Sequence, residues 1–168
     1  MVKRIKHSSY CFGCGKSNFQ GLILQFREVG ASIEAEFIPD EYCQGQPGIV
    51  HGGIIAALMD EAASQFLHRR GIPAMTSAMK IKIRRQLVIG ESVQVSASLS
   101  NRKKTRKISR RNYFFLEVII VGEKGKIAES FITLISAVSP LAEELFERRE
   151  PAAESILPDV DEELLGLR

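Results

Sequence analysis

The stretch GQPGIVHGGIIAALMDEAASQFLHRR, residues 45–70, decides the fold. It begins with a Pro47–Gly48 turn, and its pattern becomes helical from about Gly52. Apolar residues on one stripe predict the core face of this helix: Ile55, Met59, Ala62 and Phe66. The helix is expected to continue to about Arg70 and to stop at the breaker segment 71–73, Gly-Ile-Pro.

Two neighbouring carboxylates on this helix point in different directions. At 100° per residue, Asp60 shares a face with small residues, among them Gly53, Ala57 and Ser64. Small neighbours leave room for a substrate beside the carboxylate, or they let another backbone approach, and both interpretations stay open. Glu61 is a rival carboxylate on a third face, which Gln65 and His68 make more similar to a solvent-exposed face.

Length and composition indicate one soluble domain. The chain has 168 residues and a net charge of +3, and its longest apolar run, Tyr113–Val121, is too short to span a bilayer. The first ten residues are basic but no apolar signal segment follows them, so we expect a cytoplasmic protein. Residues 141–168 carry nine acidic side chains against three arginines. The remaining body is therefore basic and suits an anionic ligand, either nucleic acid or a phosphorylated cofactor.

The cysteines are too few for a disulfide framework. Cys11, Cys14 and Cys43 are expected to be reduced thiols. A structural zinc site needs four ligands, and the other candidates, His7 and Cys43, have no regular spacing to the Cys-x-x-Cys pair. The sequence therefore predicts no metal and a tight loop that packs its thiols, with a zinc or redox role as the alternative.

Alternating segments predict strands on both sides of the helix. Leu22–Glu28 and Ser32–Ile38 form a predicted hairpin, and residues 39–50 a loop. Four more strands are expected after the helix: Thr76–Val88, Ser92–Ser100, Ile108–Val121 and Ile127–Val138. We therefore predict an α+β domain over residues 1–138, with about six antiparallel strands around one helix. Residues 139–168 are expected to form a short helix and an acidic tail, and dimerisation would cover the exposed sheet edges.

A charge run lies between two of these strands. Asn101–Lys107 is expected to be a hairpin tip, and its Arg102, Lys103 and Lys104 are candidates for contact with a ligand phosphate.

Several motifs together resemble the hotdog-fold acyl-CoA thioesterases, in particular the phenylacetate-pathway type. They are His51–Gly52–Gly53 with Asp60 nine residues after the histidine, and Cys11-Phe-Gly-Cys-Gly with Asn18 and Gly21–Leu22. The resemblance covers about residues 10–137 and implies a hotdog fold with its site at a dimer interface. It assigns Thr76 to the site, with Ser77 beside it. Where the family often has Asn before the histidine, this chain has Gly45, so Gln44 and Gln46 become the candidate substrate contacts.

Thioester hydrolysis needs oxyanion donors and a group that activates or replaces water. The N–H groups of Gly52 and Gly53, at the helix N-terminus, are the candidate donors. Asp60 is the candidate base or nucleophile, Thr76 a residue that holds the attacking water, and His51 either a loop-orienting residue or a hydrogen-bond donor. Gly53 and Asp60 are about 10 Å apart along one helix. If both act on one thioester, Asp60 must come from a second subunit.

The predicted function is hydrolysis of acyl-CoA thioesters by a homodimer, or a dimer of dimers. It needs no cofactor beyond the CoA of the substrate, and no nucleic acid or membrane partner is expected. A non-catalytic acyl-CoA-binding protein and a hotdog enoyl-CoA hydratase or dehydratase are the alternatives.

Overall fold

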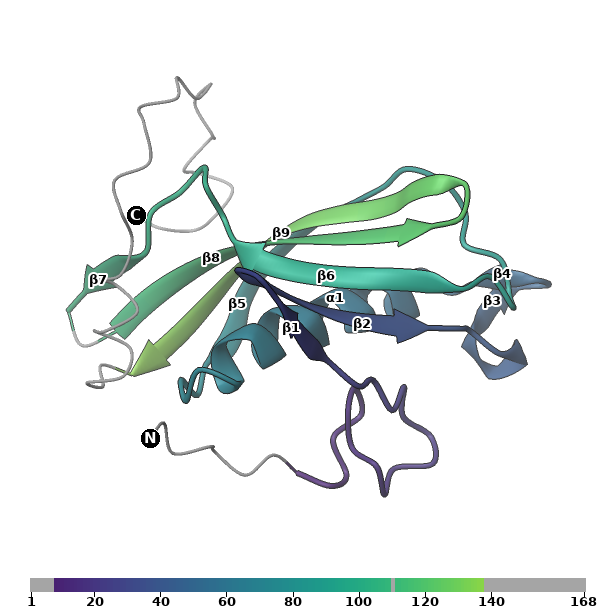
Figure 1. Ribbon diagram of the computed structural model, residues 1–168, viewed down its shortest axis with the longest axis horizontal. Coiled ribbons are helices and arrows are strands. Elements are labelled where there is room, and N and C mark those ends of the chain that lie inside the picture. The colour runs from purple at the N-terminus through teal and green to yellow at the C-terminus, as the bar shows by residue number, and fades with distance from the viewer. Residues whose placement is uncertain (1–7, 110, 138–168) are drawn as a thin grey trace.

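Helix α1, Gly52–His68, lies along one face of a large antiparallel sheet (Figure 1). The computed structural model describes residues 8–109 and 111–137. The predicted C-terminal helix and acidic tail, residues 139–168, lie outside the described residues. The helix has its expected start and ends two residues before the expected Arg70, because the chain leaves the helix toward Gly71, which has a φ of +75°.

The large sheet has seven strands in the order β1-β2-β6-β8-β9-β5, with β7 paired to β8. Their bounds are β1 Arg27–Val29, β2 Ser32–Phe37, β5 Met75–Ile83, β6 Val93–Leu99, β7 Arg106–Ile108, β8 Arg111–Gly122 and β9 Gly125–Ala137. A separate ribbon of β3, Gln44–Gln46, and β4, Ile49–Val50, follows the 3-10 turn Glu41–Cys43. One helix against an antiparallel sheet confirms the predicted α+β hotdog fold.

Several predictions differ from the structure in detail. The strand predicted over Thr76–Val88 ends at Ile83, and the loop predicted over residues 39–50 contains β3 and β4. The predicted strand Ile108–Val121 is divided, because Ser109 adopts a left-handed φ of +57° and Ile108 belongs to β7. This division makes seven strands instead of about six, and it turns the predicted hairpin tip into a loop that leads from β6 into β7. The first predicted strand, Leu22–Glu28, is paired only from Arg27, whereas the hairpin turn at Gly30 is as expected.

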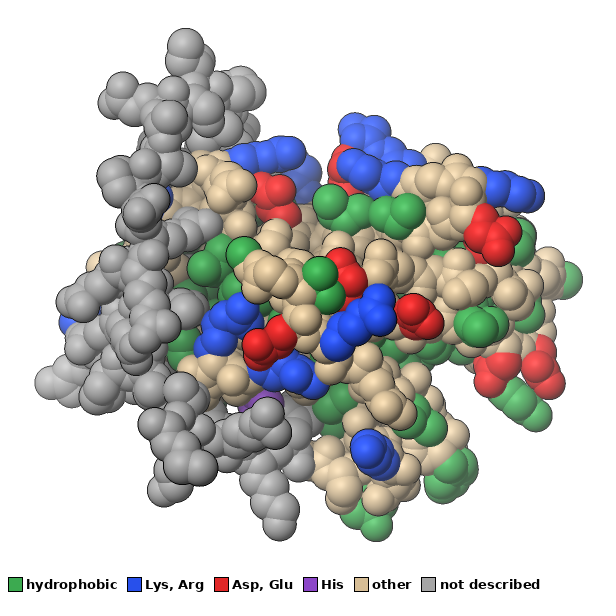
Figure 2. Space-filling view, viewed as in Figure 1, with side chains coloured by type: hydrophobic (Ala, Val, Ile, Leu, Met, Phe, Trp, Pro, Cys, Tyr) green, Lys and Arg blue, Asp and Glu red, His purple; other side chains and the backbone are tan. Residues whose placement is uncertain are grey.

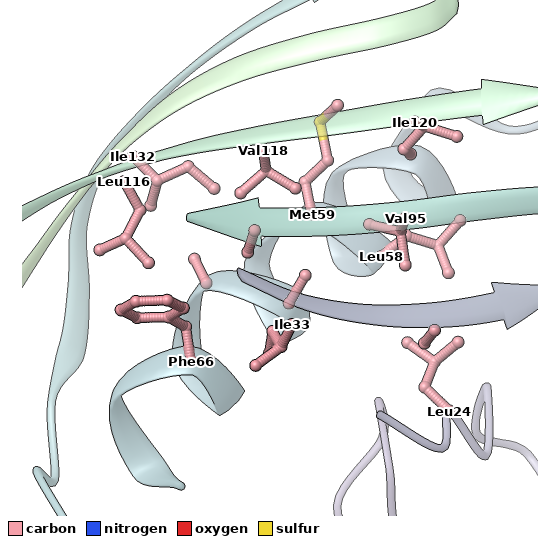
Figure 3. Close-up of a cluster of buried hydrophobic side chains, with 14 of the residues drawn as sticks. Leu24, Ile33, Leu58, Met59, Phe66, Val95, Leu116, Val118, Ile120 and Ile132 are labelled. Atoms are coloured by element: carbon pink, nitrogen blue, oxygen red, sulfur yellow. The ribbon is translucent and has the colours of Figure 1, made fainter. Parts of the chain in front are cut away.

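The core fills the space between α1 and the concave face of the sheet (Figure 3). Leu58, Met59 and Phe66 of α1 are at most 1% exposed, and they face alternate residues of the central strands. On β8 these inward-facing residues are Phe114, Leu116, Val118 and Ile120. Alternation places Tyr113, Phe115 and Glu117 on the opposite face of the sheet.

The N-terminal loop, residues 8–26, covers a second side of the helix. Its Leu24 and Phe26 are buried in the core, and Gly13 lies so close to Glu61 that an added Cβ would be 2.3 Å from the Glu61 Cγ. Glu61 and Gln65 are consequently 9% and 6% exposed. The prediction that this face of the helix is open to solvent was wrong, because an irregular segment distant in sequence packs on it.

The surface carries charges of both signs. Figure 2 shows Lys and Arg side chains interspersed with Asp and Glu on the viewed face. Several of them are paired, as in the contacts of Arg27 with Glu34 and of Lys126 with Glu129. Among the described residues, no helix is long and apolar enough to cross a bilayer.

Truncation of Leu58 should show how strongly the fold depends on α1 packing. Leu58 is fully buried, so Leu58→Ala should lower the free energy of unfolding by about 2–5 kcal/mol in a urea titration. Val29, which is 41% exposed, provides the control, because Val29→Ala should change it by no more than about 0.5 kcal/mol. Equal effects of the two substitutions would contradict this description of the core.

Candidate functional site

His51 caps the N-terminus of α1. Its backbone is extended, its carbonyl accepts from Ile54 N–H at 2.9 Å, and its Nδ1 accepts from Gly53 N–H at 2.9 Å. Because Nδ1 is the acceptor, the neutral ring carries its proton on Nε2. His51 therefore orients the start of the helix through Nδ1, and its Nε2–H leaves its other predicted role, hydrogen-bond donation, open.

The two predicted oxyanion donors differ in their surroundings. Gly53 N–H is engaged by His51, whereas within the described part of the chain Gly52 N–H meets no acceptor. An added Cβ at Gly53 would be 2.8 Å from His51 Nδ1, but at Gly52 it would meet only Ile83 Cδ1, at 4.0 Å. Gly52 thus presents an exposed N–H at the positive end of the helix dipole, with open space beside it.

Asp60 contacts Thr76, a residue that the sequence prediction assigned to the same site. The Thr76 hydroxyl of β5 donates to Asp60 Oδ1 at 2.5 Å, and both residues are half-buried. The helix stripe around Asp60 stays partly open, because its members are small and neither the sheet nor the N-terminal loop covers them: Ala56, Ala57 and Ser64. The carboxylate therefore lies at an accessible surface next to a hydroxyl group.

A β-bulge determines the direction of Thr76. Thr76 pairs with Leu134 and Ala78 with Thr133, so Ser77 is an extra residue in β5. Thr76 and Met79, three positions apart, then both lie opposite core-facing residues of β9, whereas strict alternation would place them on opposite faces. Ser77 itself is exposed beside the Asp60–Thr76 pair.

Gln44 and Gln46 lie in the β3–β4 ribbon that precedes His51. The side-chain carbonyl of Gln44 accepts from Gly48 N–H at 3.1 Å and closes the turn, and Gln46 pairs with Ile49. Both glutamines are exposed. The Gln44 side chain stabilises the ribbon, and that of Gln46 is accessible near the helix N-terminus.

The predicted phosphate-binding residues lie on the other face of the sheet. Arg102 forms an ion pair with Glu117 at 3.3 Å, and the Lys103 ammonium lies 4.5 Å from the centre of the Phe115 ring. Glu117 and Phe115 point away from α1, and Lys104 is exposed in the same loop. One chain therefore does not bring these cations together with its own Asp60.

A second group of polar residues, which the sequence prediction did not assemble, lies on the covered side of α1. Cys11, Cys14 and Glu61 place their Sγ and carboxylate atoms within 4.8 Å of one another. The Cys-x-x-Cys motif indicated two members of this group. The third member is Glu61, whereas the sequence analysis considered His7 and Cys43 as the further metal ligands. Cys43 is buried elsewhere, and its burial raises the pKa of its thiol.

This architecture, one capped helix in an antiparallel sheet with an Asp–Thr pair at its open side, defines the chain as a hotdog-fold protein. Residues 47–107 match the Thioesterase superfamily. The chain is 39% identical over 54 residues to the acyl-coenzyme A thioesterase THEM5 of Mus musculus, a match that covers 32% of this chain and 22% of that protein. These matches confirm the resemblance to thioesterases that the sequence motifs predicted.

Solved structures of thioesterase-like proteins have the same fold. A hypothetical thioesterase protein from Streptococcus pneumoniae with coenzyme A has a TM-score of 0.58 at 12% identity, covering 68% of this chain and 85% of that one. A putative thioesterase related to phenylacetic acid degradation, from Ralstonia eutropha, has a TM-score of 0.56 at 17% identity, covering 68% and 85%. At these identities the likeness concerns the fold.

Removal of the His51 cap should destabilise α1. His51→Ala leaves Gly53 N–H without its acceptor, and we expect a loss of about 0.5–2 kcal/mol in unfolding free energy, as for other N-caps. His51→Asn restores a side-chain acceptor at this position and should recover most of the loss in a urea titration. If His51→Ala were as stable as the wild type, the cap would contribute nothing.

Proposed function

We propose that this protein hydrolyses acyl-CoA thioesters to the free acid and CoA. The observation that carries the proposal is the Thr76–Asp60 hydrogen bond at the open side of α1. It joins a carboxylate to a hydroxyl that can hold water, on the same helix whose N-terminus presents Gly52 N–H. No cofactor beyond the CoA of the substrate is required by this chemistry.

Two relatives support this assignment. One structure of the Streptococcus pneumoniae protein contains coenzyme A, and two others carry alanine in place of an aspartate and of a threonine, respectively. Those two substituted positions are separated by 16 residues, the same separation as Asp60 and Thr76. The matched mouse protein is an acyl-coenzyme A thioesterase, although the chain spans only 22% of its length.

The reaction can be written with these groups. The Thr76 hydroxyl donates a hydrogen bond to Asp60 and keeps its proton, so its oxygen can still accept a hydrogen bond from water. Asp60 removes a proton from this water as the oxygen attacks the thioester carbon, and the carbonyl oxygen becomes an oxyanion. Gly52 N–H stabilises the oxyanion, joined by Gly53 N–H if the His51 side chain turns away. Collapse of the intermediate breaks the C–S bond, and protonated Asp60 returns its proton to the leaving CoA thiolate, which restores the carboxylate. In the alternative mechanism, Asp60 attacks the carbon directly and the CoA thiolate leaves with a proton from solvent, and water then hydrolyses the mixed anhydride to the free acid and Asp60.

The site is proposed to be completed by a second subunit. Gly52 and Asp60 are eight residues apart in one continuous helix, or about 12 Å, so one carbonyl group cannot contact both. The stripe around Asp60 is open and lies beside β5, the last strand of the sheet. A partner that covers this stripe and edge would bring its own helix N-terminus to Asp60, which makes a homodimer the smallest complete unit.

The remaining predicted contacts are assigned to substrate binding. Gln46 is exposed near the helix N-terminus and Ser77 beside Asp60, and both are proposed to contact the acyl part of the substrate. Arg102, Lys103 and Lys104 lie across the sheet from Asp60 of their own chain. We therefore propose that they bind CoA phosphates for a site to which another subunit contributes Asp60.

One observation favours the alternative of a binding protein without hydrolysis. Gly53 N–H is already satisfied by His51, which leaves Gly52 N–H as the candidate oxyanion donor at the helix start within the described residues. A protein of this kind would retain CoA thioesters without turnover. Hydration of an enoyl-CoA would instead indicate the hydratase alternative, so a thioester panel that includes an enoyl-CoA separates the three functions.

Substitutions at the Asp60–Thr76 pair should remove turnover without unfolding the protein. Asp60→Asn should lower kcat by about 10²–10⁴-fold, because the amide cannot accept the proton of water. Thr76→Val should lower kcat as well, whereas Thr76→Ser keeps the hydroxyl and should retain activity. Asp40 is an exposed carboxylate outside the site, and Asp40→Asn is the control. Full turnover by Asp60→Asn across a panel of acyl-CoAs would refute the proposal.

Removal of a single N–H at the helix start should test the oxyanion donor. Proline is well tolerated at the first helical position, and the extended backbone of His51 suits a residue that precedes proline. Gly52→Pro should therefore keep the helix but lower kcat by about 10²–10³-fold. Gly52→Ala keeps the N–H and fits the available space, so it should remain active.

The Gly52→Pro variant also tests whether each site is shared between two subunits. Subunits with Asp60→Asn and subunits with Gly52→Pro, unfolded together and refolded as a mixture, should recover about a quarter of wild-type activity. Roughly half of the dimers are then mixed, and each mixed dimer keeps one complete site of two. If mixed dimers form and no activity is recovered, Asp60 and Gly52 of one site belong to the same chain.

A further inference from the structure

The N-terminal loop holds the Cys-x-x-Cys motif rigidly against α1. Gly15 N–H donates to the Cys11 carbonyl at 2.9 Å, Leu22 N–H to the Phe12 carbonyl at 2.7 Å, and Leu24 N–H to the Gly13 carbonyl at 2.9 Å. The Gly13 backbone lies directly on the Glu61 side chain. The two thiols are therefore fixed on a buried carboxylate by many contacts along the loop.

The side chains of Cys11, Cys14 and Glu61 have the spacing of metal ligands. Cys11 Sγ lies 3.4 Å from Glu61 Oε2, and the ligand atoms of Cys11, Cys14 and Glu61 all lie within 4.8 Å of one another. Zinc–sulfur and zinc–oxygen bonds at a tetrahedral angle place sulfur and oxygen about 3.6 Å apart. Small side-chain movements would therefore bring all three atoms into one coordination sphere.

The charges of this cluster also favour a cation. Glu61 is 9% exposed, and its hydrogen bonds come from Cys11 and from Gln65 Nε2 at 2.9 Å. No Lys or Arg side chain of residues 8–109 and 111–137 contacts it. The carboxylate therefore has hydrogen-bond donors but no cationic neighbour among these residues, and a bound metal ion would supply the positive charge.

We propose that Cys11, Cys14 and Glu61 bind a divalent transition-metal ion, with zinc as the preferred metal. Binding releases the two thiol protons to solvent, and the ion takes two thiolates, one carboxylate oxygen and a water molecule as its four ligands. Gln65 donates to both Cys14, at 3.1 Å, and Glu61, so it holds two of the ligands in position. The ion would fasten the N-terminal loop to α1. This site is independent of thioester hydrolysis, since Glu61 points to a different side of the helix from Asp60.

Cobalt provides a direct probe of the proposed site. The full chain, purified under reducing conditions and freed of metal, should bind one equivalent of Co²⁺ with a thiolate-to-cobalt absorption band, and Zn²⁺ should displace it. Cys11→Ser and Cys14→Ser should lose the band. Glu61→Gln should weaken binding at least about 10-fold, and Gln65→Leu by roughly 10–100-fold. Cys43→Ser is the matched control, because Cys43 is a buried thiol outside the cluster, and it should bind cobalt as the wild type does.

Thermal unfolding supplies a second measurement. Zn²⁺ should raise the Tm of the wild type and of Cys43→Ser but not that of Cys14→Ser, and circular dichroism establishes that each variant is folded. Glu61→Gln changes the side-chain shape least, so it keeps the test decisive if a cysteine variant fails to fold. Absence of the cobalt band, binding that survives Cys11→Ser, or a Cys11–Cys14 disulfide that persists in reductant would each overturn the proposal. None of these results depends on whether the protein hydrolyses thioesters.

Discussion

The structure depends on the burial of α1 from two directions. The sheet covers the side that carries Leu58, Met59 and Phe66, and the N-terminal loop covers the side that carries Glu61 and Gln65. Apolar burial on the first side supplies the dominant stabilising free energy. The stripe around Asp60 and the helix N-terminus stay accessible, so a ligand from solvent can reach the helix at these places.

Asp60 and Glu61 show how this packing gives adjacent carboxylates different environments. A rotation of 100° places Asp60 beside the Thr76 hydroxyl at an open surface, and places Glu61 against two thiols beneath the N-terminal loop. The carboxylate of Asp60 thus lies in a polar, accessible environment, whereas that of Glu61 lies in a closed environment beside two thiols. The helix serves as the common support, and the segments packed on it decide what each side chain can do.

Much of the fold could be predicted because local rules govern it. Gly71 and Gly30 mark the helix C-terminus and the first hairpin through their positive φ angles, and helical periodicity separates the core stripe from the Asp60 stripe. Burial of Glu61 could not be predicted in this way. Periodicity shows which residues share a face, but it does not show that an irregular loop 50 positions away will cover that face. The left-handed Ser109, which divides a predicted strand, likewise carries no glycine signal.

The bulge in β5 has a consequence for the tolerance of this site to change. Thr76 faces α1 only because Ser77 adds one residue between it and Met79. The direction of Thr76 therefore depends on whether the number of residues between it and Met79 is even or odd, and not on the side chain of the extra residue. A substitution at position 77 keeps this count, whereas an insertion of one residue there would turn the hydroxyl to the other face while leaving every residue of the site present. The number of residues in this strand should therefore be conserved more strictly than the side chain at position 77. A change of length there would alter the site more than a substitution would.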